Sequence, residues 1–268
     1  MITKFIRRNV PVLIAFVACG VSDVRAELDY SPYQRVLEMF VDENGHVEYE
    51  ALSKKSGDLR IFTTTLSNKS PRSHPDAFNK YSDRLAYWIN AYNALVLSGV
   101  VSAYPVESVK AIREQMGFFS QMYFTVGGQR LSLNDIEHEI LRKEFTDPRI
   151  HAAINCASIS CPGLSRSVYR PEILESQLEH AMETFVAEHV QLDREHQEVT
   201  LSKIFDWFGE DFAGWYQNDK GVKKAHILDY VGLYLKMADR QFTNGSKRPS
   251  IRYSAYNWKL NDLQRGGD

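Results

Sequence analysis

The sequence feature that most constrains the fold is a long apolar stretch at residues 85–101, which reads LAYWINAYNALVLSGVV. Its large apolar side chains recur at intervals of three and four residues, a spacing that predicts a mostly buried helix. Asn93 falls within the apolar face of this helix, and a buried carboxamide without partners costs roughly 1–3 kcal/mol. Asn93 therefore either hydrogen-bonds the backbone of a neighbouring loop or orients a ligand or catalytic group. Asn90 is a second candidate binding residue on the same helix.

A second stretch, residues 147–164 (DPRIHAAINCASISCPGL), combines an apolar run with two of the three cysteines. The run at 149–155 predicts a short buried strand, because turn residues bound it and a proline at a strand's first residue costs no ladder hydrogen bond. We expect this strand to lie inside the sheet, packed by the predicted helices. The small residues that follow Cys156 predict a loop. Polar and sulfur-bearing groups at the end of a buried strand make this loop the first candidate for a functional site.

The helix predicted at residues 132–143 places an acidic residue on its apolar face. Ser132 and Asp135 have the spacing of a capping box, with Asp in place of Glu. On a wheel of 3.6 residues per turn Glu137 lies in the middle of the apolar face, and His138 lies on its flank. A buried carboxylate needs a partner or a shifted pKa, and we expect Arg149, Asn93 or a histidine as that partner. The structural alternative is that Glu137 only forms an ion pair and that His138 is an ordinary flanking residue.

A nucleophilic cysteine needs a base or a positive environment to form its thiolate, and the chain offers two histidines near Cys156. His138 is one candidate, with Glu137 as its carboxylate, but adjacent residues on a helix do not face each other. His151 is the other, but on a regular strand its position five residues before Cys156 would point it to the opposite face. Asn155 or the amides of residues 157–160 are candidate oxyanion donors.

The composition excludes several functional classes. A net charge of −2 offers no basic surface for nucleic acid, so we expect no nucleic-acid partner. The chain contains no G-x-G-x-x-G, P-loop or C-x-x-C motif, so we predict no cofactor. A metal site of His138, His151 and a cysteine lacks diagnostic spacing, and we predict none. Helical periodicities predict a single α+β domain, rich in helix, with a small sheet. The shorter predicted elements are an extended segment at 118–126 with a hairpin turn at Gly127-Gly128, a strand at 199–202 and a last helix at 227–237.

The first 26 residues have the pattern of a targeting segment and are left out of the fold prediction. A basic beginning precedes an apolar run that is too short to span a bilayer. Val24-Arg25-Ala26 fits ordinary signal cleavage, whereas Phe16-Val17-Ala18-Cys19 resembles a lipobox in which Cys19 would carry the only membrane anchor. Cleavage after Ala26 is favoured because Phe16 is a weak lipobox residue. Both routes predict an exported protein of the bacterial envelope, periplasmic or secreted, in which Cys156 and Cys161 could form a disulfide.

Several long motifs together resemble the DUF547 family, a domain of unknown function. These motifs are YWINAYNALVL, LSLNDIEHEILR, DPRIHAAINCASISCPGL, LSKIFDWFGEDF and YNWKLND. The family has been likened to papain-type cysteine peptidases through a Glu–His–Cys arrangement. The resemblance implies Glu137, His138 and Cys156 as catalytic residues, with His151 and Cys161 as alternatives for the histidine and the thiol, and it implies a papain-like fold.

The leading functional hypothesis is a cysteine-dependent hydrolase or transferase that acts on a peptide or other acyl substrate. A second hypothesis is a non-catalytic module in which the loop, Asn90, Asn93 and Arg149 bind a small molecule, a peptide or a partner protein. A third is thiol redox chemistry through Cys156 and Cys161, which is less favoured because the usual C-x-x-C spacing is absent.

Overall fold

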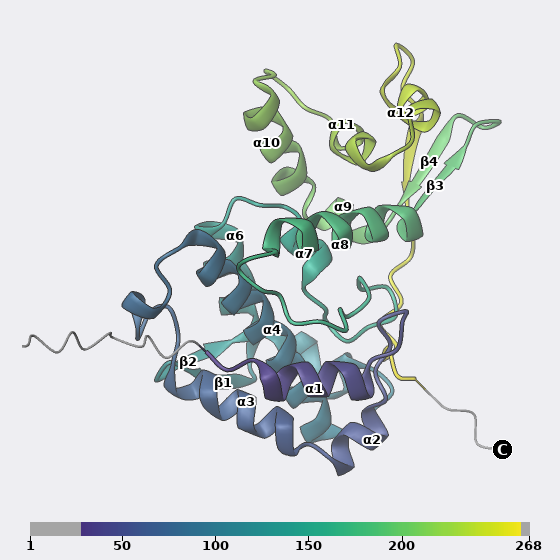
Figure 1. Ribbon diagram of the computed structural model, residues 1–268. Helices are drawn as coiled ribbons and strands as arrows, with labels where there is room; N and C mark the ends of the chain where they lie inside the picture. Colours follow the sequence, from purple (N-terminus) through teal and green to yellow (C-terminus); the bar gives the residue numbers. More distant parts are fainter. Residues whose placement is uncertain (1–27, 264–268) are drawn as a thin grey trace, which may run out of the picture.

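The computed structural model describes residues 28–263 (Figure 1). The predicted targeting segment and its processing sites lie outside the described residues. The described part of the chain forms the expected helix-rich α+β domain. No helix in the described range has the length and apolarity that crossing a membrane would require.

The longest helix, α4 (Tyr81–Ala103), confirms the prediction from the apolar stretch and begins four residues earlier than Leu85. It is the centre of the N-terminal half, where almost every side chain from Leu85 to Leu97 is buried. Three helices precede it in the chain; the second and third contact it directly, and the first packs on those two (Figure 1). These are α1 (Ser31–Phe40), α2 (Tyr49–Lys54) and α3 (Gly57–Asn68).

A β-hairpin follows α4, as the Gly127-Gly128 turn signal predicts. Strands β1 (Tyr123–Val126) and β2 (Gln129–Ser132) pair antiparallel, and both turn glycines have positive φ. The predicted strand at 118–126 begins late, because a helical turn, α5 (Gly117–Ser120), occupies its first part. The chain also has short 3₁₀ turns at Pro75–Ala77, Val109–Ala111, Glu114–Met116 and Gly232–Tyr234.

After the hairpin the backbone forms a π-helix, η4 (Asp135–Leu141), which continues into α6 (Arg142–Glu144). The capping box predicted for its start is present. The Asp135 carboxylate accepts hydrogen bonds from the Ser132 amide and hydroxyl, and the Asp135 amide donates to Ser132 Oγ. The helix type differs from the prediction, because in a π-helix the hydrogen bonds run from residue i to i+5.

The prediction of a buried strand at 149–155 is wrong. The segment is buried, but its first part is a short helix, α7 (Ile150–Ala153), and no sheet includes it. The Asp147-Pro148 pair is the physical reason. Asp147 Oδ1 accepts a hydrogen bond from the Arg149 amide at 3.0 Å, and the carbonyls of Asp147 and Pro148 accept from the amides of the next residues but two, so that the chain enters a turn that leads into the helix. The alanines of this segment favour helix once that turn has formed.

The C-terminal half has its own hydrophobic core. A three-stranded sheet has the order β3-β4-β5, with β3 antiparallel and β5 parallel to β4. The predicted strand at 199–202 is confirmed as β4. The predicted helix at 227–237 is instead split in two. The elements of this half are α8 (Leu174–His189), β3 (Val190–Asp193), β4 (Glu198–Leu201), α9 (Lys203–Trp207), α10 (Gly209–Lys220), α11 (Ile227–Val231), α12 (Met237–Asn244) and β5 (Ser250–Tyr253).

The segment after β5 connects the two halves. It leaves the sheet and runs back along the N-terminal half, as the yellow trace in Figure 1 shows. Isolated β-bridges pair Ser108 with Lys259, Ser158 with Leu260, and Val47 with Asp262. The closing segment therefore lies against the cysteine loop and fixes it between the two hydrophobic cores.

Candidate functional site

A pocket of about 170 Å³ lies at the junction of the two cores. Its walls come from α4, η4, α7, the cysteine loop, α9 and the closing segment. Five of the predicted site residues line it, namely Glu137, His138, His151, Cys156 and Cys161. The full lining comprises Tyr92, Met116, Phe119, Asn134, Glu137, His138, His151, Ile154, Cys156, Cys161, Ile204, Trp207, Phe208, Tyr256 and Trp258.

The two cysteines form a disulfide at the pocket surface, between Cα atoms 6.1 Å apart. Cys161 is buried and Cys156 is partly exposed. Two hydroxyl groups contact the Cys156 sulfur: Ser158 Oγ at 3.0 Å and the Tyr256 hydroxyl at 3.1 Å. These hydroxyls are 2.9 Å from each other. The sulfur that sequence analysis selected is therefore surrounded by hydrogen-bond donors rather than by a histidine.

Asn93 and Asn155 fix the backbone of the cysteine loop. Asn93 Nδ2 donates to the Ala153 carbonyl at 2.9 Å, and Asn93 Oδ1 accepts from the Asn155 amide at 2.8 Å. The Asn155 side chain bonds the Pro162 carbonyl and the Ala157 amide within the loop. The side chain of Asn155 is therefore engaged, as are the amides of residues 157, 159, 160 and 161. Apart from the amide of Ser158, the predicted oxyanion donors are therefore already bonded, either within the loop or to the closing segment.

Asn90 likewise hydrogen-bonds a backbone segment, but one that lies outside the cysteine loop. Its carboxamide donates to the Tyr169 carbonyl and accepts from the Tyr169 amide, at 2.8 and 2.9 Å. Asn90 does not line the pocket. The two asparagines of α4 thus each hold one buried backbone segment, and only Asn93 holds the segment that carries the cysteines.

Glu137 is only partly buried, and its partner is not among those predicted. Its Oε2 accepts a hydrogen bond from the Tyr92 hydroxyl at 3.0 Å. Burial, together with the charge of Glu137, raises the pKa of Tyr92 well above its ordinary value, so Tyr92 stays a donor. The expectation that this carboxylate would be largely inaccessible came from a wheel of 3.6 residues per turn, which does not apply to a π-helix.

His138 lies on the pocket wall beside Arg142. Arg142 Nη1 is 3.2 Å from His138 Nδ1. A guanidinium can only donate, so this contact requires Nδ1 to be an acceptor and puts the proton of the neutral ring on Nε2. Within the described residues His138 has no hydrogen bond to Glu137 or to either sulfur. The Glu137–His138 pair is thus brought into the pocket but is not assembled as a hydrogen-bonded dyad.

His151 forms the histidine–carboxylate pair of the site. Its Nε2 lies 2.8 Å from Asp211 Oδ2, and its buried ring stacks on Phe208 with centroids 4.1 Å apart. Asp211 also receives two hydrogen bonds from Arg142, at 2.6 and 2.9 Å. Burial would raise the pKa of Asp211, but the hydrogen bonds from His151 and Arg142 outweigh burial and hold it below its ordinary value. Asp211 is therefore ionised at neutral pH and fixes the orientation of the His151 ring.

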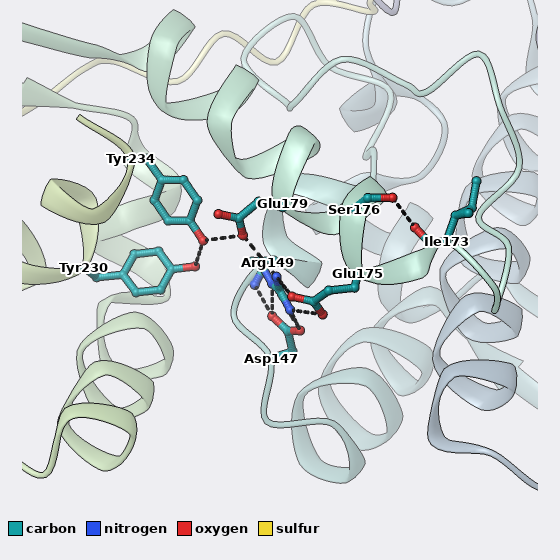
Figure 2. Close-up of polar contacts among 8 residues, drawn as sticks. All are labelled: Asp147, Arg149, Ile173, Glu175, Ser176, Glu179, Tyr230 and Tyr234. Carbon is teal, nitrogen blue, oxygen red and sulfur yellow. Dashed lines mark hydrogen bonds and ion pairs between the residues drawn. The ribbon is translucent and has the colours of Figure 1, made fainter. Parts of the chain in front are cut away.

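Arg149 lies on the other side of α7, away from the pocket lining. Figure 2 shows its guanidinium held between Asp147 and two glutamates of α8, Glu175 and Glu179. The side chain is only 13% exposed. Glu179 in turn accepts a hydrogen bond from the Tyr234 hydroxyl at 3.4 Å. Arg149 thus connects α7, α8 and the C-terminal helices through contacts within the protein.

Sequence analysis missed Asp211, Tyr256 and the aromatic wall that Trp207, Tyr256 and Trp258 form. The ring centroids of Tyr256 lie 4.8 Å from Trp207 and 4.4 Å from Trp258. Burial raises the pKa of Tyr256 to about 12, so its hydroxyl remains a donor at neutral pH. A signal was present, because these residues fall in the motifs LSKIFDWFGEDF and YNWKLND. Among the residues described, no cluster of His, Cys, Asp and Glu has the arrangement of a metal site.

Residues 76–186 match the model of a family described as "Protein of unknown function, DUF547". The matched segment contains Glu137, His138, His151 and both cysteines, whereas Asp211 and Tyr256 lie beyond it. Comparison with curated proteins and with solved structures found no match. The likeness to papain-type peptidases therefore stays an expectation from the sequence.

Proposed function

Given that residues 76–186 place this chain in the DUF547 family, whose function is unknown, we propose a function from the pocket itself. We propose that it is the active site of a cysteine-dependent hydrolase or transferase for peptide or other acyl substrates. Cys156 is the nucleophile, and the His151–Asp211 pair is its base. The single observation that supports this most is that Cys156 and His151, whose ring is held by Asp211, line the same pocket.

The geometry favours His151 over His138 as the base. On a regular strand His151 and Cys156 would point to opposite faces, but this objection does not apply because residues 150–153 are helical. With Nε2 bonded to Asp211, His151 keeps Nδ1 to accept a proton, which is the role of a histidine held by a carboxylate. His138 has its Nδ1 occupied by Arg142. In this proposal His138 contributes its Nε2–H as a donor to developing negative charge.

The reaction follows ordinary acyl transfer. The Cys156 thiol gives its proton to His151, and the thiolate forms a bond to the substrate's carbonyl carbon. The bond from that carbon to the leaving group breaks, and the leaving group takes the proton from His151. Water or an acceptor nucleophile then cleaves the thioester and restores the thiol. Tyr256 and Ser158, whose hydroxyls contact the sulfur, stabilise the thiolate and the oxyanion in place of the occupied loop amides.

The active form in this proposal is the reduced one. A dithiol reductant must first open the Cys156–Cys161 bond by thiol–disulfide exchange, becoming a disulfide itself while both cysteines gain protons. We also propose that the chain is exported to the bacterial envelope. The sequence pattern of residues 1–26 supports this proposal, and so does a disulfide, which persists in oxidising compartments.

Iodoacetamide labelling as a function of pH tests the proposal. The unmodified protein should label only after reduction with dithiothreitol. Reduced Cys161→Ser protein should label well below the ordinary thiol pKa of about 8.5. Adding His151→Ala should move the labelling profile to higher pH, whereas adding His138→Ala should move it less. An ordinary thiol profile in all three proteins would refute the catalytic role of Cys156.

The disulfide itself favours a second candidate function, thiol–disulfide exchange with a partner protein. This candidate predicts that the Cys161→Ser protein forms a lasting mixed disulfide with a dithiol substrate but cleaves no acyl bond. The non-catalytic binding hypothesis receives less support, because Asn90, Asn93 and Arg149 all bond to groups of the protein itself.

A further inference from the structure

The pocket presents one carboxylate among mostly aromatic and apolar side chains, together with Asn134 and two histidines. Glu137 is its only acidic lining residue, and no lysine or arginine within the described range lines it. Glu137 Oε2 accepts from Tyr92, whereas Oε1 accepts no hydrogen bond from any described residue. The nearby positive charge of Arg142 is directed to Asp211, which it contacts at 2.6 Å. Glu137 therefore forms no ion pair with any described residue at the pocket surface, although Arg142 lies close enough to interact with its charge.

The aromatic wall adds a second attraction for positive charge. The faces of Trp and Tyr rings attract cations through their quadrupoles, most strongly for Trp. The aromatic wall already makes one cation–π contact within the protein, because Lys110 Nζ lies 4.6 Å from the Trp258 ring centroid. Lys110 does not line the pocket. Trp207, which is 44% exposed, and Tyr256 remain available to a ligand in the pocket.

These observations lead us to infer that the pocket recognises an ammonium group, so that the substrate is an acyl compound or peptide that carries a primary amine close to the bond that is cleaved. Glu137 binds the ammonium, and Trp207 and Tyr256 cover its carbon stem. This inference rests on the proposed function for the position of the scissile bond. Tyr256 joins the two parts of the site, because its hydroxyl is 3.1 Å from the Cys156 sulfur and its pKa responds to the charge of Glu137.

The volume of the pocket limits the size of the amine that it can hold. A cavity of roughly 150 Å³ is known to hold benzene, and this pocket measures about 170 Å³. A six-membered ring with one amino group therefore fills it. Cyclohexylamine, which is cationic at pH 7, and cyclohexanol, which is neutral and of nearly the same shape, form a matched pair of probes.

The experiment measures binding of both probes to the oxidised protein, by tryptophan fluorescence and calorimetry. In this form Cys156 has no free thiol, so the result is independent of the labelling test of the proposed function. Cyclohexylamine should bind at least about tenfold more tightly than cyclohexanol, a difference of about 1.4 kcal/mol. In Glu137→Gln the preference should fall to within about twofold, and a normal melting temperature would show that the variant is folded.

Glu139→Gln is the matched control. Glu139 lies on the same π-helix but is exposed and pairs with Lys143, so this variant should keep the full preference. Equal binding of the two probes to the unmodified protein would overturn the inference and leave a neutral apolar pocket. Undetectable binding of both probes would overturn it as well. A preference that persists in Glu137→Gln would remove Glu137 from the recognition.

Discussion

Asn93 Oδ1 accepts a hydrogen bond from the Asn155 amide at 2.8 Å, directly before the first cysteine of the loop. Together with the bond from Asn93 Nδ2 to the Ala153 carbonyl, it satisfies both backbone groups that flank Ile154. The same two bonds engage both the amide nitrogen and the carbonyl oxygen of the Asn93 side chain. A polar residue on the apolar face of α4 thereby sets the position of Cys156 in the pocket.

Replacing Asn93 by alanine should lower the free energy of unfolding by roughly 2 kcal/mol, because a buried amide and a buried carbonyl lose their partners. It should also slow iodoacetamide labelling of reduced Cys156. Asn90→Ala is the control, since Asn90 makes equivalent bonds to Tyr169 outside the pocket. That variant should be destabilised to a similar extent in urea unfolding but should label normally. Equal labelling of the two variants would contradict a positioning role for Asn93.

Replacing Asp211 by asparagine should remove a pH-dependent part of the stability. The pKa of Asp211 is held below its ordinary value in the folded protein, so its stabilisation is present above the unfolded pKa of about 3.9 and is lost as the pH falls. Urea unfolding should therefore show a large deficit of Asp211→Asn at pH 7 and a smaller one at pH 3. A constant deficit at both pH values would contradict the ionic role. Asp58→Asn, which removes a surface pair with Arg35, should cost less at either pH.

Replacing Arg149 by methionine should lower the free energy of unfolding by roughly 2–4 kcal/mol, because the poorly exposed Asp147 loses its ionic partner. The matched control is Arg35→Met. Arg35 also makes a two-point contact with a carboxylate, but its side chain is 50% exposed, so the loss should stay below about 1 kcal/mol. Chemical denaturation at pH 7 measures both. Similar losses would show that the network of Figure 2 is no more than surface pairing.

Replacing Tyr256 by phenylalanine should move the labelling profile of reduced Cys161→Ser protein to higher pH, by up to about one unit, because the thiolate loses a hydrogen-bond donor. The shift should appear without a large change in melting temperature, since the ring and its stacking partners remain. Tyr253→Phe is the control, because Tyr253 belongs to β5 and lies over Lys203 rather than at the sulfur. An unchanged profile in Tyr256→Phe would exclude the hydroxyl from thiolate stabilisation.

The sequence alone predicts those elements whose pattern is long or whose turn chemistry is specific. The periodicity of residues 85–101 predicts α4, Gly127-Gly128 predicts the hairpin, and Ser132 with Asp135 predicts the start of the next helix. The prediction of a strand at 149–155 fails because four buried apolar residues fit helix and strand equally well. The sequence does not predict the π-helix for a related reason, since a helical wheel of fixed period cannot detect a local change in the hydrogen-bonding pattern.

The sequence determined that Glu137, His138, His151 and the two cysteines lie on consecutive elements, which is why all five line one pocket. Only the tertiary structure decided which partners these residues bond. Asp211 is 60 residues from His151 and Tyr256 is 100 residues from Cys156 along the chain. These contacts depend on how the C-terminal core docks on the N-terminal one and on the return of the closing segment. Local periodicity reports only the burial of each element, whereas the partner that a buried polar group finds is set by packing between distant segments.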